Sequence, residues 1–327
     1  VEQQQSVAVR LICDREREIQ AFIPREYWSV TARLETLGKD EFTAKLAKKD
    51  GKKIELGNGE ESGAVLRELE GAPYKVAEVE TKETKRNPAA PFTTSKLQQE
   101  AARKLGYSAK KTMMLAQQLY EGVELGDEGP VGLISYMRTD STRISEEAVA
   151  FARDFIEKKY GASYLPKAPN VYKTKKKSQD AHEAIRPTYF QHPPDEVKEH
   201  LSRDQFRLYQ LIWNRFIACQ MTHALIDQTR AQIQAKNYTF NASGSTVKFP
   251  GFMAVYIEGQ DIEEEKEEKL PALKKDEPLS LLGLDPAQHF TQPPPRFTEA
   301  SLVKELEEKG IGRPSTYAAI ISTIQDR

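Results

Sequence analysis

The heptad Ser-Tyr-Met-Arg-Thr-Asp-Ser at residues 135–141 is the densest grouping of potentially reactive side chains in the chain. A tyrosine hydroxyl is a poor nucleophile at neutral pH because its ordinary pKa is about 10. Two residues after Tyr136, the planar guanidinium of Arg138 can favour the phenolate and also hold a phosphate oxygen. Asp140 can orient that arginine. The alternative, from these residues alone, is a half-buried tyrosine beside a surface arginine.

A second group, Asp-Ala-His-Glu-Ala-Ile-Arg-Pro at residues 180–187, follows a lysine-rich loop. If this segment is helical, His182 and Arg186 share a face and both can point at phosphate. It is not the zinc motif H-E-x-x-H, because Arg186 stands where the second histidine would be. A solvated helical turn is the alternative interpretation.

A third group lies between two predicted helices near the end of the sequence. Gly310 and Gly312 allow the backbone to approach a ligand closely. Arg313 and a helix start at Ser315 form a corner suited to phosphate, and Tyr317 can stack on a base. The chain has no G-x-x-x-x-G-K-[ST] motif, so no ATP-binding P-loop is expected. An ordinary joint between two helices is the alternative.

A fourth group lies on a helical stripe predicted for residues 6–22. Arg10, Asp14 and Arg17 share one face of that helix, and Gln5 comes just before it. Two arginines on one face can follow the phosphates of a nucleic acid. A solvent-exposed amphipathic helix shows the same pattern.

The alternation of apolar residues predicts the strands that position these groups. Single strands are expected at Tyr27–Leu34, Tyr74–Thr81 and Val131–Met137. A turn is expected at Lys48–Lys53. Arg230–Ile257 is expected to form a β-meander that turns at Asn241–Gly244. The strand Val131–Met137, which is expected to be buried, would place Tyr136 at its end, on a rigid element beside a polar turn.

Capping residues predict the helices. Ser95 and Gln98 have the spacing of a capping box in a helix that closes at Gly106, and Ser108 starts the next helix. Two short helices around a glycine resemble a helix-turn-helix unit, or are simply two packed helices. Further helices are expected from Ser145, around Asp204–Met221, from Thr298 to Gly310, and from Ser315. The fold class is therefore α+β in several domains.

Composition narrows the function classes. The 327 residues carry a formal net charge of −1, which argues against a uniformly basic nucleic-acid binder but allows local basic patches. No apolar run is long enough for a membrane span, and no signal peptide is visible. Cys13 and Cys219 are expected to be buried thiols, as in a reducing cytoplasm, and leave no zinc site of four cysteines.

Taken together and in order, the four groups resemble the type IA DNA topoisomerase family, in particular bacterial topoisomerase I. S-Y-M-R-T-D-S is similar to the family's active-site signature. D-A-H-E-A-I-R-P-T is similar to its second motif, and P-P-P-R-F-T-E-A-S-L-V-K-E-L-E-E-K-G-I-G-R-P-S-T-Y-A to its third. Q-S-V-A-V-R-L-I resembles the helix that lines the DNA groove.

The resemblance implies a transient cut in one DNA strand. Tyr136 would form a 5′-phosphotyrosine, another strand would pass, and negative supercoils would relax without ATP. Arg138 would position Tyr136 and the phosphate, and His182 would help to bind that phosphate. The residues implied to contact DNA are Gln5, Arg10, Asp14, Asp140, Arg186, Arg313, Ser315 and Tyr317.

The resemblance also implies a toroidal fold with three domains. A base that holds the single strand would comprise residues 1–54 and 251–327. A β-rich arch would comprise residues 55–95 and 223–250, and a helical domain with the tyrosine residues 96–222.

Two departures from the family pattern qualify the expected activity. Family members begin with a Toprim domain that binds Mg²⁺ and supplies cleavage-site residues, and many bacterial members end with zinc ribbons; neither is found here. At the junction, Glu2-Gln3-Gln4 stands where the family usually has A-G-R-V. We therefore expect a cytoplasmic, nucleoid-associated fragment that lacks Mg²⁺ ligands and works weakly without the parent's Toprim domain. The alternative function is single-stranded DNA binding without covalent chemistry.

Overall fold

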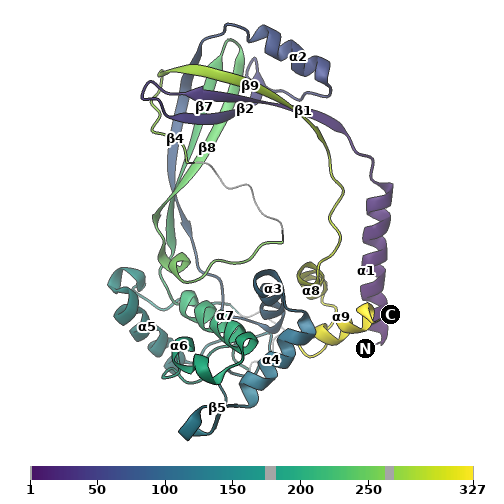
Figure 1. Ribbon diagram of the computed structural model, residues 1–327, viewed down its shortest axis with the longest axis vertical. Helices are drawn as coiled ribbons and strands as arrows, with labels where there is room; N and C mark the ends of the chain where they lie inside the picture. Colours follow the sequence, from purple (N-terminus) through teal and green to yellow (C-terminus); the bar gives the residue numbers. More distant parts are fainter. Residues whose placement is uncertain (1, 174–181, 262–268, 327) are drawn as a thin grey trace.

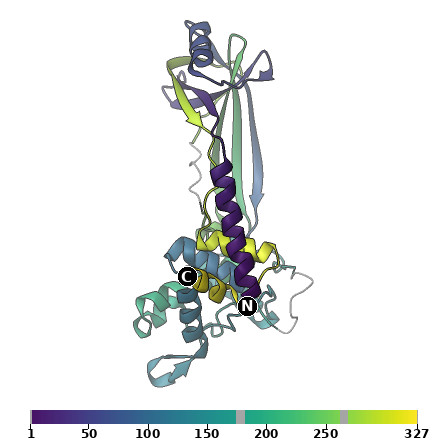
Figure 2. The ribbon, with the colours of Figure 1, turned by 90° about the vertical axis from the view of Figure 1, so that its right-hand side faces the viewer.

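The computed structural model describes residues 2–173, 182–261 and 269–326. The backbone forms a ring with a β-sheet at one end and a group of helices at the other (Figure 1). α1 joins the two ends on one side, and the long strands β4, β7 and β8 join them on the other. Seen from the side the ring is narrow, with α1 running along it (Figure 2). The predicted α+β toroidal fold is confirmed.

The helices are α1 (Glu2–Ala21), α2 (Gly59–Glu68), α3 (Thr94–Leu105), α4 (Ala109–Glu121), α5 (Glu146–Tyr160), α6 (Pro194–Val197), α7 (Arg203–Cys219), α8 (Glu299–Glu308) and α9 (Tyr317–Gln325). The strands are β1 (Glu26–Glu35), β2 (Glu41–Lys49), β3 (Lys52–Lys53), β4 (Tyr74–Arg86), β5 (Val123–Glu124), β6 (Pro130–Val131), β7 (Ala224–Ala235), β8 (Tyr238–Phe249) and β9 (Pro278–Phe290). The described residues also form the 3-10 turns η1 (Gly126–Glu128), η2 (Ala162–Tyr164), η3 (Lys198–His200) and η4 (Gly251–Ala254).

The large sheet is antiparallel and closed on itself. Its strand order is β1-β9-β4-β7-β8-β2-β3, and β1 also pairs with β2. Closing a sheet removes exposed edges that would otherwise pair with other chains. Inward-facing residues such as Val30, Ile233 and Phe240 fill its core. Because β1, β2 and β9 pair with strands of the predicted arch, a boundary at residue 54 would cut this sheet, and the three-domain division stays a proposal.

The turn of the β7–β8 hairpin differs from the prediction. Asn241 and Gly244 lie inside β8, where they pair with Gln232 and Thr229. The chain instead turns after Ala235, and Lys236 takes a left-handed φ of 50°. The predicted turn was wrong because polar residues on an exposed strand have the same composition as a turn.

The helical end of the ring contains two separate apolar clusters. One joins α3, α4, α5 and α7 with Phe252 and Tyr256. The other joins Ala8 of α1 with Leu302, Ile320 and their neighbours on α8 and α9. We call the first body the tyrosine unit and the second the base unit.

Helix starts and cysteine burial were predicted with mixed success. Ser108 and Ser145 cap α4 and α5, as expected. α3 begins earlier than predicted, because Thr93 and not Ser95 caps it, and the Gln98 side chain is buried without a hydrogen bond.

Of the two thiols, Cys219 is buried as predicted, whereas Cys13 is exposed. None of the helices in the described ranges is long and apolar enough to cross a membrane.

Gly251→Ala is expected to destabilise the tyrosine unit by about 3 kcal/mol. Gly251 has φ +52°, and an added Cβ would overlap the carbonyl oxygens of Thr222 and His223. Urea unfolding followed by the fluorescence of Trp213, which is buried in that unit, measures the loss. The control is Gly106→Ala: with φ +68° and ψ +25°, in the left-handed helical region, and nothing within 4 Å of the added Cβ, it should lose about 1 kcal/mol. Equal losses for both variants would contradict the steric argument.

Candidate active site

The segment that carries Tyr136 is buried as predicted, but it is not a strand beyond Val131. Its backbone bonds are irregular: the Leu133 amide donates to Leu119 O (2.8 Å) and the Ser135 amide to Arg186 O (2.8 Å). A single bridge, Ile134 to Pro187, joins it to the second motif. The predicted strand was therefore wrong, because its backbone partners are helix ends and loops.

Two hydroxyl groups that the sequence analysis missed hold this segment in place. The buried Thr94 side chain donates to Met137 O (2.7 Å) and accepts from the Thr139 amide (2.8 Å). The Ser135 hydroxyl donates to Ala184 O (2.7 Å) and accepts from the Arg186 amide (2.9 Å). The start of α3 and the second motif thus fix the residues on both sides of Tyr136.

The Tyr136 side chain is 39% exposed and lies between two other rings. The Tyr120 ring on α4 packs edge-on against it, with centroids 5.4 Å apart. The His182 ring lies 5.9 Å away on a tilt of 30°. The structure therefore brings the predicted pair Tyr136 and His182 together and adds Tyr120, which was not among the predicted site residues. The Tyr136 ring is therefore held by its neighbours while part of its surface is open to solvent.

Arg138 connects the tyrosine unit to the base unit. Its Nη1 donates to the backbone oxygen of Ser315 (2.9 Å), a residue 177 positions later. Two predicted groups therefore lie next to each other: the heptad and the segment from Gly310 to Tyr317, which we call the glycine corner. Asp140 is exposed, and the contact of Arg138 is with Ser315 rather than with that carboxylate.

The glycine corner has the expected backbone but a different role for its tyrosine. Gly310 and Gly312 both have positive φ, 68° and 83°. The exposed Arg313 donates from its backbone amide to Thr316 Oγ1 (2.9 Å), a hydroxyl absent from our predicted site. Tyr317 is only 6% exposed, and burial raises its pKa to about 12. Because it packs in the base-unit core, it is not available to stack on a base in this conformation.

The second motif is not helical over its described part, so His182 and Arg186 do not share a helix face; Asp180 and Ala181 lie outside the described residues. Arg186 pairs with Glu183 (2.6 Å), and its other nitrogens donate to Pro187 O and Ser145 Oγ. These bonds use its guanidinium to hold the loop, so we assign it no phosphate contact.

α1 presents a charged face that continues from the base unit. The Arg10 and Arg17 side chains are 80% and 76% exposed, and Asp14 lies between them at 3.7 Å and 3.0 Å. Gln5 is partly buried one turn earlier. Two exposed guanidinium groups on one face are available to phosphate, and Asp14 holds both at a fixed spacing.

A magnesium site does not fit the residues at hand. Within residues 2–173, 182–261 and 269–326, no three His, Cys, Asp or Glu side chains come together in a way that could hold a metal ion. We therefore assign no step of the chemistry to a metal.

The fold and the composite site define a topoisomerase. A DNA topoisomerase family model matches residues 4–327, and the chain belongs to that family, as a type IA member. It is 51% identical over 330 residues to DNA topoisomerase 1 of Rickettsia felis and of Rickettsia bellii, in each case over 99% of this chain. Full-length topoisomerase I from Thermotoga maritima superposes with a TM-score of 0.78 at 37% identity, over 99% of this chain.

The chain is shorter than these relatives. It spans 42% of the R. felis protein, 41% of the R. bellii protein and 50% of the T. maritima chain. The activity of the whole relatives is therefore a proposal for this chain.

Proposed function

We propose that this chain holds single-stranded DNA across its base unit and cuts it through Tyr136. The observation that carries the proposal is the contact between Arg138 and Ser315, which brings the exposed tyrosine to the edge of a corner suited to phosphate. The ring-shaped backbone would then enclose the strand that passes, and relaxation of negative supercoils would follow without ATP.

The reaction is a transesterification. The Tyr136 oxygen attacks the phosphorus of a backbone phosphodiester, and the bond from phosphorus to the 3′ oxygen breaks. The phenolic proton is lost, and the leaving 3′ oxygen gains a proton to become a hydroxyl. One ester replaces another, so the bond energy is kept and resealing is the reverse reaction. Because the bond energy is kept in the new ester, the reaction needs no nucleoside triphosphate.

Each residue has a separate task in this proposal. Arg138 faces the phosphate from the tyrosine side, and Arg313 faces it from the base side; both can neutralise charge on the nonbridging oxygens. His182, next to the Tyr136 ring, can donate to a phosphate oxygen or move the phenolic proton. Gln5, Arg10 and Asp14 would hold the strand farther along α1.

Covalent trapping tests the proposal. A single-stranded oligonucleotide labelled at its 3′ end is mixed with the chain and quenched in denaturant. Because the 5′-phosphate side of the cut stays on the tyrosine, a labelled protein band is the expected result. Salt-sensitive binding without a band would support the alternative, a single-stranded DNA-binding module without covalent chemistry.

The affinity for single-stranded DNA should fall with salt, and Arg10→Ala should reduce the slope of log K against log salt by about 0.7. The reason is that each phosphate contact releases about that many counterions from a single strand. Fluorescence anisotropy across a salt series measures the slope. The matched control is Arg33→Ala, which removes an arginine that is paired with Asp285 on the sheet (2.8 Å). Equal slopes for Arg10→Ala and the unaltered chain would exclude this face from the DNA path.

A further inference from the structure

The tyrosine unit and the base unit meet along two pairs of helices, and Ala318 on α9 also packs against the apolar cluster of the tyrosine unit. α3 packs against α8, and α4 against α9. A cavity of ≈450 Å³ lies in this interface, and small residues such as Ala102, Gly106 and Ala300 line it. Gln99 lies on the same face of α3, and its buried amide has no hydrogen-bond partner. Because this space and this amide leave part of the interface unfilled and unpaired, polar contacts between the two units contribute to their docking.

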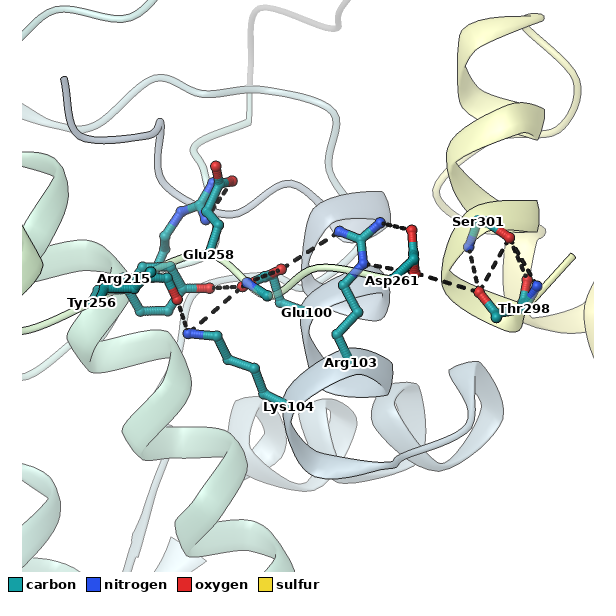
Figure 3. A network of polar contacts seen from close by, with 11 residues as sticks. Glu100, Arg103, Lys104, Arg215, Tyr256, Glu258, Asp261, Thr298 and Ser301 are labelled. Carbon is teal, nitrogen blue, oxygen red and sulfur yellow. Dashed lines mark hydrogen bonds and ion pairs between the residues drawn. The ribbon is translucent and has the colours of Figure 1, made fainter. Parts of the chain in front are cut away.

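The first polar contact runs through residues 256–261, a segment that is hydrogen-bonded to α3. Glu100 is buried and accepts hydrogen bonds from Tyr256 and from the Gly259 amide (3.0 Å). Figure 3 shows Arg103, one turn further on, reaching Asp261 at the end of this segment. The two groups form a bidentate pair (3.0 and 2.8 Å), which also lowers the pKa of Asp261.

Asp261 then meets the base unit. Its Oδ1 lies 3.5 Å from the hydroxyl of Thr298, the residue that caps α8 (Figure 3). The path from Arg103 through Asp261 to Thr298 therefore crosses from one unit to the other.

The second polar contact is a helix cap supplied from the other unit. Glu299, the first residue of α8, accepts from the amide of Ala109, the first residue of α4 (2.7 Å). The amides at a helix start have no partner within the helix and favour a negative charge. The other oxygen of Glu299 accepts from Gln325 on α9 (2.8 Å). One carboxylate therefore joins α4, α8 and α9, and the far end of α4 carries Tyr120, which packs on Tyr136.

We propose that Glu299 is a positioning residue that docks α4 on the base unit, assisted by the Arg103–Asp261–Thr298 path, and so assembles the composite cleavage site. The role of Glu299 in assembling a cleavage site rests on the proposed function. Its role in docking the two units does not, and that role is tested without DNA.

The test is a distance measurement between spin labels on the two units. Cys13 on α1 is exposed and takes one label, and Glu157→Cys at an exposed position of α5 takes the other. Cys219 stays unlabelled because it is buried, and burial raises its thiol pKa to about 12. The labelled Glu157→Cys chain, with Glu299 unchanged, should give a single distance distribution. Glu299→Ala should raise the ratio of separated to docked molecules roughly tenfold, the loss expected for a charge-assisted hydrogen bond.

Conservative and matched variants separate docking from general damage. Glu299→Gln keeps an oxygen for the Ala109 amide and should restore most of the docked population. Glu305→Ala removes an acid of the same helix that pairs with Lys309 and should change nothing. If Glu299→Ala does not fold, Arg103→Gln tests the same docking from the opposite unit. Unchanged distances in the folded variants would overturn the inference, whereas loss of the covalent adduct in the parent would overturn only the proposed function.

Discussion

Replacing Tyr136 by phenylalanine is expected to abolish covalent attachment to DNA, with a loss in rate on the order of 10⁴-fold or more. The change removes the oxygen that would attack the phosphate and leaves the ring, so the contacts with Tyr120 and His182 persist. Binding of a single-stranded oligonucleotide should therefore change by less than about twofold. Adduct formation is followed on denaturing gels with a 3′-labelled strand, and affinity by anisotropy at one fixed salt concentration.

Tyr120→Phe is the matched control for this experiment. Tyr120 is also about as exposed as Tyr136, 40% against 39%, and it lies in the same ring cluster. Removing its hydroxyl should leave the adduct, since the proposal gives that oxygen no bond to form. An adduct that survives in Tyr136→Phe but disappears in Tyr120→Phe would move the nucleophile to α4.

The helices with local capping signals were the easiest part of the fold to predict. Ser108, Ser145 and Thr298 each cap a helix where expected, because the stabilising bond joins residues three apart. Thr93 shows the limit of such signals. It and Ser95 are both good caps by type, and the chain uses Thr93 because the buried Thr94 is bonded to Met137 and Thr139.

The environment of Tyr136 depends on contacts that no local pattern contains. The apolar run before it was correctly predicted to be buried, yet its backbone partners, Leu119 and Arg186, come from other segments. Arg186 was expected at phosphate because of its type and spacing. It is engaged because Glu183 and Ser145 surround it in the folded chain.

Tyr317 shows how a motif can mislead about burial. Its position after a glycine corner suggested a ring free to stack on a base. In the structure α1 covers the inner face of α9, and Ala8 packs in the same cluster as Tyr317 and Ile320. That packing joins residues about 300 positions apart, which periodicity within α9 alone does not predict. Thr316, beside it, was missed because its bond to the Arg313 amide depends on the shape of the turn.

The candidate site is therefore built from segments that are far apart in the sequence and that belong to two units with separate apolar clusters. The heptad, the second motif and α4 hold Tyr136, while the glycine corner and α1 present cations from the other unit. Polar contacts join the two units, and a separate apolar cluster stabilises each one. A site divided in this way can be assembled and separated without unfolding either core.

Arg138→Ala is expected to slow adduct formation by roughly 100- to 1000-fold, the range found when one charge-stabilising donor is removed from an active site. Two contributions are lost together: the guanidinium that would face the phosphate, and the bond from Nη1 to Ser315 O that joins the units. Arg138→Lys keeps the charge but not the planar fork, so it should recover only part of the rate. Single-turnover trapping at saturating oligonucleotide separates this loss from weaker binding.

Arg143→Ala provides the comparison, because it removes an exposed arginine five residues further along the same loop. It should lower affinity slightly at low salt and leave the single-turnover rate within about twofold, as expected for a charge that only attracts the strand. If the two arginine variants lose rate equally, the effect is one of general charge. If Arg138→Ala loses affinity but not rate, the residue binds DNA without contributing to the cleavage step, and the contact with Ser315 serves docking alone.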